Sequence, residues 1–339
     1  MATPGWNQTQ SPFHPGELAV QSRLGFQAQV DQQGRRMIRT YLTEQHRQFF
    51  AQLSYIVVGS LDQASRPWTS LLIGQPGFLS TPDVHTLQVT ASYLAGDPLS
   101  QNVRPGCDIG FLGIDLSTRR RNRLNGKVTD IRAEGFTVQV QQSFGNCPQY
   151  IQSRALQGNT RYPLKENLEE NLEENVEESV EESADKSTHA LSTLSPAATA
   201  LITSADTFFI TTAYQSRSAG LASGVDVSHR GGKPGFIKVE DNRTLTVPDF
   251  SGNKHFNTFG NLELNPRAGL LFIDFTDCHL LYLTGSATVI WNGPAVEAFE
   301  GAERLLQFQL ERGYWANGSL PLRWSTPTFS PYLANTGIW

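Results

Sequence analysis

The sequence predicts a mainly β protein with short helices, built from two tandem barrels that are copies of one unit. Three observations predict this class: short β-rich runs fill both halves, similar motifs recur at one spacing, and an acidic repeat separates the halves. The chain has 339 residues, of which 39% are hydrophobic and 17% charged, an ordinary globular composition. This length accommodates two domains or one large duplicated unit.

The duplication rests on matches that keep their order along the chain. "GFLGID" at 110–115 matches "GLLFID" at 269–274, an offset of 159, and the same offset carries "NG" at 125–126 onto "TG" at 284–285. "QPGF" at 75–78 matches "KPGF" at 233–236 at an offset of 158. We therefore predict an internal repeat of about 100 residues.

Each copy contains five β-rich runs. They are "SYIVVGSLD", "PWTSLLIG", "TLQVTA", "DIGFLGIDL" and "TVQVQ" in the first copy, and "TFFITTAY", "GLASGVDV", "TLTVPD", "AGLLFIDF" and "HLLYLTGSATVIW" in the second. Short helices are predicted at 43–53, 196–204, 252–264 and 294–312, the third ending at Asn265-Pro266. The expected organisation is an N-terminal arm (1–42), a first barrel (43–152), an acidic linker or insert (153–195), a second barrel (196–293) and a C-terminal helix and tail (294–339).

The acidic segment 165–186 repeats a four-residue unit and contains nine Glu and one Asp against two Lys. It carries a charge of −8 within a chain of −5, so the remaining residues carry about +3. A helix would stack like charges at i, i+4 without basic partners, which predicts a frayed helix or a disordered linker. The alternative is a docking element for a basic partner.

Several function classes are excluded by absent signals. The first residues lack the pattern of a secretory signal, and no apolar run reaches membrane-spanning length. Three cysteines, Cys107, Cys147 and Cys278, form neither a disulfide framework nor a paired metal motif, and the histidines include no HxH or HxxxH pair. We expect a cytoplasmic protein that has no metal site and does not bind a membrane.

Four arginines fall within "STRRRNRLNGKV" at 117–128, between two predicted strands, and therefore belong to an ordered hairpin. At an offset of 159, residues 119–123 fall on "CHLLY" at 278–282, so the fold accepts an apolar strand there. Conversely, "SHRGGKPGF" at 228–236 replaces "SLLIGQPGF" at 70–78. Each copy is thus polar where the other is apolar, which indicates a function other than folding.

Clustered Arg, Lys, Ser and Gly favour an anion, most simply a phosphate. A second candidate anion site is "SGNKHFNTFGN" at 251–261, at the start of a predicted helix. The alternative is a set of solvated loop cations. Nucleic acid is not expected as a partner, because the hairpin has no interleaved aromatic residues and the chain has no basic overall field.

The second copy, through "SHRGGKPGFIKVEDNRTLTVPDFSGNKHFNTFGNLELNPRAGLLFIDF", resembles the FMN-binding split-barrel family related to pyridoxamine 5'-phosphate oxidase. The first copy, through "RPWTSLLIGQPGFL", "LGIDLSTRRRNRLNGKV" and "QSFGNCPQYIQ", resembles the two-copy branch of that family. Members are usually homodimers with FMN at the subunit interface. The resemblance implies two split barrels that form a pseudo-dimer within one chain, either alone or within a further homodimer.

The resemblance further implies one flavin site between the barrels. The predicted cofactor-binding residues are Ser228, His229, Arg230, Lys233, Lys254, Asn257, Thr258 and Asn261 of the second copy and Arg121, Asn122 and Arg123 of the first. The opposite site would combine Leu71, Leu72 and Ala95 with Leu280 and Leu281, which cannot hold a dianion. We predict one FMN per chain.

Two further motifs have alternative interpretations. The turn "QSFGNCPQYIQ" at 142–152 covers the flavin ring, with Cys147 near its reacting edge, or is a Gly-Asn-Pro turn with a buried thiol. "HPGE" at 14–17 is a substrate lid or, the favoured reading, part of an arm that packs on a barrel.

The leading hypothesis is an FMN-dependent oxidoreductase acting on a small-molecule substrate or electron donor. No side chain is assigned as acid or base, because the flavin supplies the redox chemistry. One alternative is a non-catalytic flavin or haem binder, for which His229 or His279 would be the iron ligand. Another is an electron-transfer partner of a separate reductase that docks on the acidic segment.

Overall fold

The computed structural model describes residues 5–159 and 187–339. The predictions for the acidic repeat at 165–186 fall entirely within 160–186 and so lie outside the described residues. The helices are α1 (Pro15–Arg23), α2 (Gln27–Met37), α3 (Glu44–Gln52), α4 (Leu99–Asn102), α5 (Pro196–Ser204), α6 (Asn257–Leu264) and α7 (Pro294–Glu297), with 3-10 turns η2 (Arg217–Ala222) and η3 (Pro331–Asn335).

The first half forms one antiparallel sheet. Its strands are β1 (Tyr55–Leu61), β2 (Pro67–Ile73), β3 (Leu79–Ser80), β4 (Thr86–Thr90), β5 (Asp108–Asp115), β6 (Arg120–Arg132) and β7 (Gly135–Gly145). They are ordered β2-β1-β5-β6-β7-β4-β3. Every residue of β1 and β2 is buried, as expected for strands rich in β-branched and aromatic residues inside a barrel wall.

The second half forms the other main sheet. Its strands are β10 (Thr207–Tyr214), β11 (Gly224–Gly231), β12 (Lys238–Val239), β13 (Thr244–Asp249), β14 (Arg267–Ile273), β15 (Leu280–Ile290) and β16 (Arg304–Ala316), with β9 (Thr188–Leu191) paired to β16. They are ordered β11-β10-β14-β15-β16-β13-β12. A small sheet pairs β8 (Leu156–Asn159) with β17 (Leu322–Trp324).

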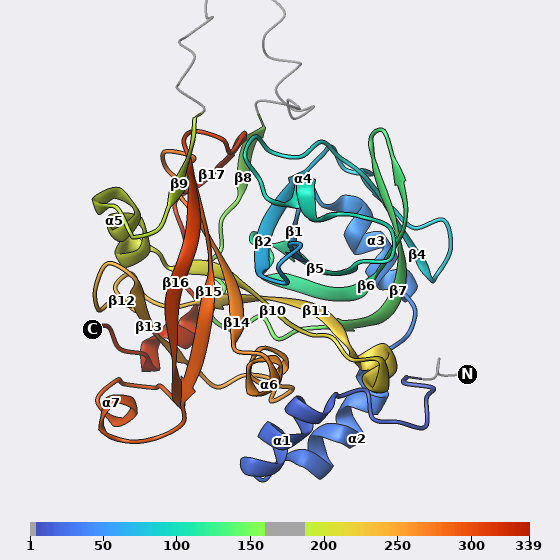
Figure 1. Ribbon diagram of the computed structural model, residues 1–339, viewed down its shortest axis with the longest axis horizontal. Helices are drawn as coiled ribbons and strands as arrows, with labels where there is room; N and C mark the ends of the chain where they lie inside the picture. The colour runs from blue at the N-terminus through green and yellow to red at the C-terminus, as the bar shows by residue number, and fades with distance from the viewer. Residues whose placement is uncertain (1–4, 160–186) are drawn as a thin grey trace, which may run out of the picture.

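The two strand orders correspond position by position, which is the topology of a duplicated unit. Each strand of the first sheet has a partner at the same place in the second, from β2 and β11 at one end to β3 and β12 at the other. Figure 1 shows the two barrels side by side, the first in blue to green and the second in yellow to red. The fold is therefore mainly β, with two tandem barrels, as predicted.

The two halves contact each other through equivalent strands. β11 packs on β5 of the first half, and the equivalent β2 packs on β14 of the second. A Cβ added to Gly110 would lie 2.5 Å from the carbonyl oxygen of Val225, and one added to Gly269 would lie 2.3 Å from that of Pro67. Since Gly110 and Gly269 are equivalent residues, the glycines allow the same close backbone approach twice.

Hydrophobic packing fills the junction as well as each barrel. One cluster of buried residues draws from both halves, including Val57, Leu71 and Leu112 from the first and Phe209 and Leu271 from the second. The Thr69 and Thr211 hydroxyls lie 2.7 Å apart within this junction. The pseudo-dimer thus has a continuous apolar interior, as a stable subunit interface would.

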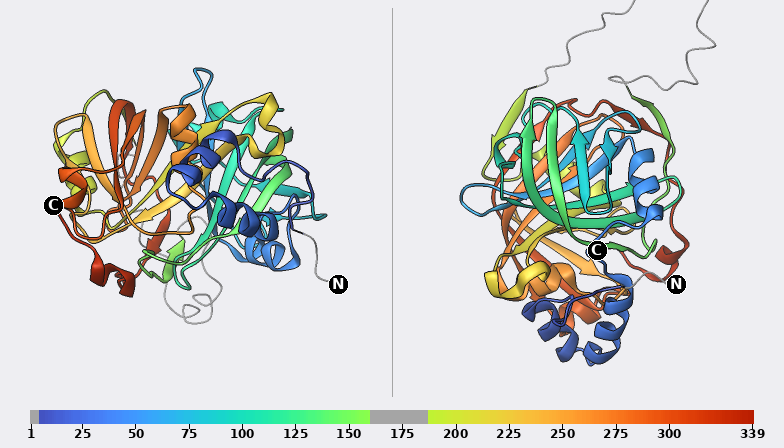
Figure 2. Two further views of the ribbon diagram at one scale, coloured as in Figure 1. Left: turned by 90° about the horizontal axis from the view of Figure 1, so that it is seen from below. Right: turned by 90° about the vertical axis from the view of Figure 1, so that its right-hand side faces the viewer.

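The N-terminal arm contains α1 and α2, which lie beneath the junction, next to α6 (Figure 2). Gly16 of α1 contacts the backbone at Gly260 of α6 so closely that an added Cβ would lie 2.1 Å from its carbonyl oxygen. "HPGE" at 14–17 therefore starts a helix that packs on the second barrel. This supports the arm interpretation over the lid.

The helix predicted over 294–312 is wrong. Only Pro294–Glu297 is helical, while Arg304–Ala316 forms β16 and extends the second sheet beyond residue 293. The sequence contains the period-2 signal of a strand, because buried Leu306, Phe308 and Leu310 alternate with more exposed Gln307, Gln309 and Glu311. The ends of the predicted linker 153–195 are also ordered, as β8 and β9.

The remaining helix predictions are largely confirmed. α3 and α5 match 43–53 and 196–204, and each begins at a side-chain cap, Thr43 and Ser195. α6 is shorter than 252–264, because residues 250–256 form a loop.

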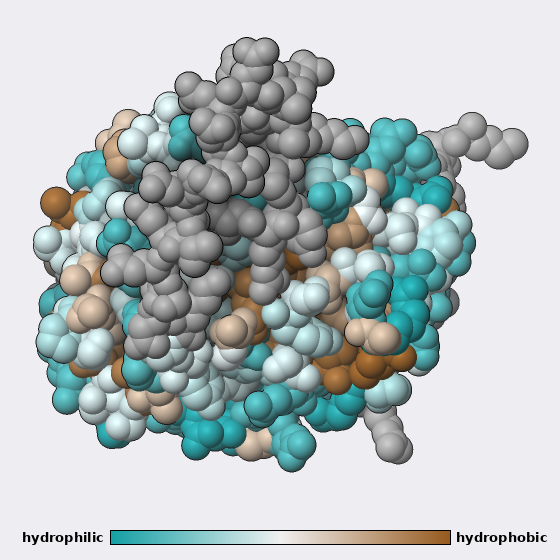
Figure 3. Space-filling model, turned by 90° about the horizontal axis from the view of Figure 1, so that it is seen from above, coloured by the Kyte–Doolittle hydropathy of each residue, from teal (hydrophilic) through white to brown (hydrophobic). Residues whose placement is uncertain are grey.

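The described helices include none long and apolar enough to cross a membrane. Outside the part drawn in grey, the face seen from above mixes hydrophilic areas with smaller hydrophobic ones (Figure 3).

Candidate functional site

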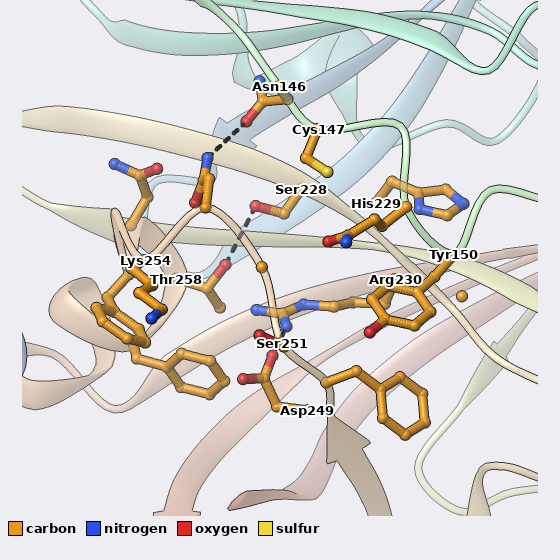
Figure 4. A pocket seen from close by; sticks show the side chains of 18 of the residues that line it. Asn146, Cys147, Tyr150, Ser228, His229, Arg230, Asp249, Ser251, Lys254 and Thr258 are labelled. Atoms are coloured by element: carbon orange, nitrogen blue, oxygen red, sulfur yellow. Dashed lines mark hydrogen bonds and ion pairs between the residues drawn. The ribbon is translucent and has the colours of Figure 1, made fainter. Parts of the chain in front are cut away.

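A pocket of about 120 Å³ lies at the junction of the two barrels. Its wall combines β11 and the loop before α6, from the second half, with β6 and the segment after β7, from the first. In Figure 4, Asn146, Cys147 and Tyr150 face Ser228, His229 and Arg230 of β11, with Lys254 and Thr258 at one end. The tertiary structure thus joins segments that are about 100 residues apart in sequence.

Eight of the eleven predicted site residues line this pocket. They are Arg121, Arg123, Ser228, His229, Arg230, Lys254, Asn257 and Thr258. The sequence prediction therefore located one real cavity from three separate segments.

Arg123 is buried and connects the two halves through a polar network. Its Nη2 donates to Ser228 Oγ at 2.5 Å, its Nη1 donates to Asn257 Oδ1 at 2.7 Å, and it pairs with Asp226 at 3.1 Å. The Thr258 hydroxyl donates to Ser228 Oγ at 3.2 Å. Burial raises the pKa of Asp226, which the Arg123 guanidinium opposes by favouring the carboxylate. The charge of Arg123 is therefore compensated within the protein.

Arg121 differs, because its hydrogen-bond partners are neutral carbonyl groups. Its Nε donates to the Cys147 carbonyl at 2.7 Å and its Nη1 to the His229 carbonyl at 3.4 Å. In the described part of the chain, no carboxylate forms an ion pair with it. Removal from water, followed by the charge of Arg123, lowers the pKa of Arg121 to about 9. At neutral pH this cation lines the pocket without a counter-ion.

Arg230 belongs to a second ionic cluster that the sequence reading did not include. Asp249, at the end of β13, pairs with Arg230 and with Arg304 Nη1, the latter at 2.6 Å. Glu303 accepts from Arg304 Nη2 at 2.6 Å. Arg304 and Glu303 were missed because they fell within the helix wrongly predicted over 294–312. In the sequence, Asp249 is marked only as a charged residue at the end of a β-rich run.

The pocket lining has an excess of positive charge. Five cationic side chains and two carboxylates line it. The cations are Arg121, Arg123, Arg230, Lys254 and Arg304, and the carboxylates are those of Asp249 and Glu303. Even when the adjacent Asp226 is included, cations exceed carboxylates. Such an arrangement attracts an anion, and guanidinium groups suit the oxygens of a phosphate.

The loop before α6 brings further polar groups to the pocket. Lys254 and Phe256 have left-handed backbone conformations, with φ of 61° and 60°. Non-glycine residues rarely adopt this conformation, and such strain concentrates at functional sites. α6 then begins without a side-chain cap, and its first residues Asn257, Thr258 and Phe259 line the pocket. The helix dipole adds a positive field there.

His229 is buried in the pocket wall, and its Nε2 has no hydrogen-bond partner among the residues that the structure describes. Burial, together with nearby Arg121 and Arg230, holds the pKa of His229 well below its usual value. The ring is therefore neutral at physiological pH. His279, the other histidine considered, lies outside the pocket, and its Nδ1 accepts from the Gly318 backbone at 3.0 Å.

Three predicted residues do not line this pocket. The ammonium of Lys233 donates to the Thr336 carbonyl at 2.5 Å, which ties down the C-terminal segment. Asn261 donates to Thr212 Oγ1 at 3.0 Å inside the second barrel. Asn122 is buried and lines a neighbouring cavity instead. The turn at 142–152, by contrast, contributes Asn146, Cys147, Gln149 and Tyr150 to the pocket.

The equivalent position in the other half is filled by protein side chains. Leu71 and Leu280 are fully buried in the junction core. Ser70, the equivalent of Ser228, donates to Asp97 at 2.5 Å, and Tyr282, the equivalent of Arg123, donates to Asp97 at 3.3 Å. The Asp97 carboxyl and the Tyr282 phenol thus take the place of the arginine network. Neither of these groups attracts an anion.

Outside the pocket, Asp274, Asp277 and His279 hold potential ligand atoms within 4.8 Å of one another. Asp274 Oδ1 already accepts from the backbone N–H groups of Thr276 and Asp277 at 2.9 Å. These contacts cap the turn between β14 and β15, which explains the cluster without an ion.

No protein-family model and no curated protein matches the sequence. Solved structures that are similar to part of the chain include two of HupZ from Group A Streptococcus and one of a putative pyridoxamine 5'-phosphate oxidase from Lactobacillus delbrueckii. Each covers 36% of this chain and 93–98% of its own, at 12% identity and TM-scores of 0.28–0.29.

Proposed function

We propose that the junction pocket binds FMN through its phosphate and that the protein is an FMN-dependent oxidoreductase. The observation that carries the proposal is Arg121, a charged group that lines a cation-rich pocket and has only neutral carbonyl partners. A phosphate would supply the missing counter-charge. A charge-assisted hydrogen bond contributes roughly 1.5–3 kcal/mol, so a few would retain the cofactor.

The residues have separable tasks on this proposal. Arg121 and Lys254 bind the phosphate, while Ser228 and Thr258 offer hydroxyl groups beside it. Arg123 positions Ser228 and Asn257, because it bonds to both. Tyr150 and Phe250, whose rings lie 5.1 Å apart on the pocket wall, offer an aromatic surface for a planar ring.

When bound, FMN supplies hydride or electron transfer at its ring. The protein's own contribution is binding, orientation and exclusion of water. The N-terminal arm helps to enclose the cationic end of the pocket, since Lys254 lies 3.7 Å from the ring centre of Phe26. No side chain of the pocket is needed as a proton donor, and neutral His229 and the Cys147 thiol are assigned no chemical step.

The test is the visible spectrum of the purified protein, together with the mass and amount of released cofactor. Arg121→Ala and Arg230→Ala should each weaken FMN binding at least about tenfold, because each removes a charge from the pocket. Arg132→Ala is the matched control, since Arg132 lies on the same strand as Arg121 but is exposed and outside the pocket. Equal FMN affinity in all variants would contradict the proposal.

A haem-binding role is the second candidate, favoured by the unpartnered Nε2 of His229. It predicts an iron-porphyrin absorbance band that is lost in His229→Ala. A colourless protein that takes up neither group would eliminate both candidates. The docking of a separate reductase on the acidic segment also stays a prediction, tested by deleting residues 166–185 and measuring the rate of flavin reduction.

A further inference from the structure

A second cavity, of about 690 Å³, adjoins the junction pocket. The two share a wall made of Arg121, Asn146, Cys147 and Asn253. Its other side is formed by Gln33 and Met37 of α2 and by the start of β6. We call it the hairpin cavity. Its volume lies within the range of about 300–1,000 Å³ that is usual for small-molecule sites.

Two buried amide groups lack hydrogen-bond partners at this cavity. The Nδ2 atoms of Asn122 and Asn146 are inaccessible to water and donate to no group in the described structure. Asn122 is only 6% exposed. Leaving a buried donor unpaired costs about 1–3 kcal/mol, which a ligand with acceptor oxygens would recover.

The cavity also has a single sign of charge. Arg119, Arg120 and Arg121 line it, and no Asp or Glu does within the described ranges 5–159 and 187–339. Arg120 lies 4.9 Å from the ring centre of Phe49, and Arg119 donates to the Ile151 carbonyl at 3.0 Å. Neither contact neutralises charge, so the cavity attracts an anion.

These residues are not required by the fold or by the phosphate site. At the equivalent positions the second half has Cys278, His279 and Leu281 in place of Arg119, Arg120 and Asn122. Arg119, Arg120 and Asn122 are also absent from the junction pocket. These three residues are therefore available to a ligand other than the one proposed for the junction pocket.

We propose that the hairpin cavity binds the second reactant and that this reactant is a small organic carboxylate. Its carboxylate oxygens accept from the hairpin arginines and, once the Asn122 side chain turns toward the cavity, from Asn122 Nδ2, while its apolar body contacts Met37 and Pro148. Its role as reactant rests on the proposed FMN function, because the shared wall places it beside the flavin pocket. Binding of the anion itself does not depend on the flavin.

The experiment uses fluorine NMR of para-fluorobenzoate added to the FMN-saturated full-length protein. Saturable broadening of the fluorine signal is expected, with neutral para-fluorobenzyl alcohol binding about tenfold more weakly or less. Asn122→Leu, which installs the residue found at equivalent position 281, should weaken carboxylate binding about tenfold. Met37→Trp should do so by filling the cavity, whereas Gln32→Trp, on an exposed part of α2 outside the cavity, should not.

The outcomes separate this inference from the proposed function. The fluorine signal reports the carboxylate whether or not flavin is bound, while absorbance of the same samples reports FMN. Carboxylate binding that is lost in Met37→Trp without FMN uptake would support the anion site and contradict the flavin proposal. FMN uptake without carboxylate binding, equal binding of the alcohol, or full binding in Met37→Trp would overturn the inference.

Discussion

The side chains of the arginine hairpin have different partners although their sequence is nearly uniform. Arg121 and Arg123 lie on one face of β6 and reach the junction pocket, as alternate residues of a strand do. Arg120 and Asn122 lie on the other face and reach the hairpin cavity. Strand alternation therefore explains why Arg123 lines only the junction pocket and Asn122 only the hairpin cavity, while Arg121 lies at the wall that the two share.

Glu17 offers a pH-dependent test of the N-terminal arm. Its carboxyl is buried between α1 and α6, where it accepts from the His14 backbone and from Asn257. Burial raises the pKa of Glu17 to about 8 from 4.5. A raised carboxyl pKa means that the folded state retains the proton, so this group's contribution to stability falls as pH rises from about 4.5 to 8.

We therefore expect Glu17→Gln to remove the pH-dependent loss of stability that Glu17 causes. The melting temperature of the wild type minus that of Glu17→Gln should decrease with rising pH across this window, because glutamine keeps the capping geometry without titrating. Burial lowers the pKa of His14 to about 4, so its own contribution to stability rises with pH, but this contribution is common to both proteins and cancels in the difference. A difference that stays constant with pH would show that Glu17 does not hold its proton.

At the scale of elements, the strands whose partners lie far away in sequence were the hardest to predict. β16 pairs with β15, β13 and β9, so its backbone hydrogen bonds come from three strands of the second half. The helix prediction over 294–312 is wrong although the alternation of buried Leu306, Phe308 and Leu310 with more exposed residues is a local signal of a strand. Arg304 and Glu303 lie within this wrongly predicted helix and are not among the predicted site residues.

The reciprocal contact between strands of the two halves yields an element-scale prediction. Gly110→Ala and Gly269→Ala should each lower the free energy of unfolding by roughly 1–3 kcal/mol, because the added Cβ meets backbone of the opposite half. Both should also weaken FMN binding, since the pocket spans that junction. Chemical denaturation and FMN titration measure the two effects.

Gly158→Ala is the control, because a Cβ there would meet only Arg323 Cβ, at an ordinary 4.0 Å. Its free energy of unfolding should stay within about 0.5 kcal/mol of the wild type. If all three variants are equally stable, the close packing of the halves contributes little to the fold.

For the whole molecule, the pseudo-twofold arrangement predicts two equivalent sites, but only one has the chemistry for an anion. The other is filled by leucines and by the hydrogen-bonded set of Ser70, Asp97 and Tyr282. We expect one FMN per chain, counted from released flavin and protein concentration. The physical reason is that a phosphate cannot be accommodated beside a buried carboxyl and apolar side chains.

Asp97→Asn tests this stoichiometry, since it removes the acid without enlarging the space. The count should stay at one FMN per chain and the affinity should not change. Two flavins per chain in the wild type would contradict the prediction of a single site, and loss of FMN in Asp97→Asn would contradict the expectation that the other half of the junction takes no part in binding.

The sequence by itself determined the duplication, most strands of both barrels and the three segments whose polar residues line the junction pocket. These were readable because they depend on local patterns and on comparison of one copy with the other. Only the tertiary structure decided that Asp249 and Arg304 join Arg230, and that Arg121 has no carboxylate partner among the described residues. Those features depend on which side chains come into contact in the folded chain. The burial of a charged group and the compensation of its charge are set by those contacts.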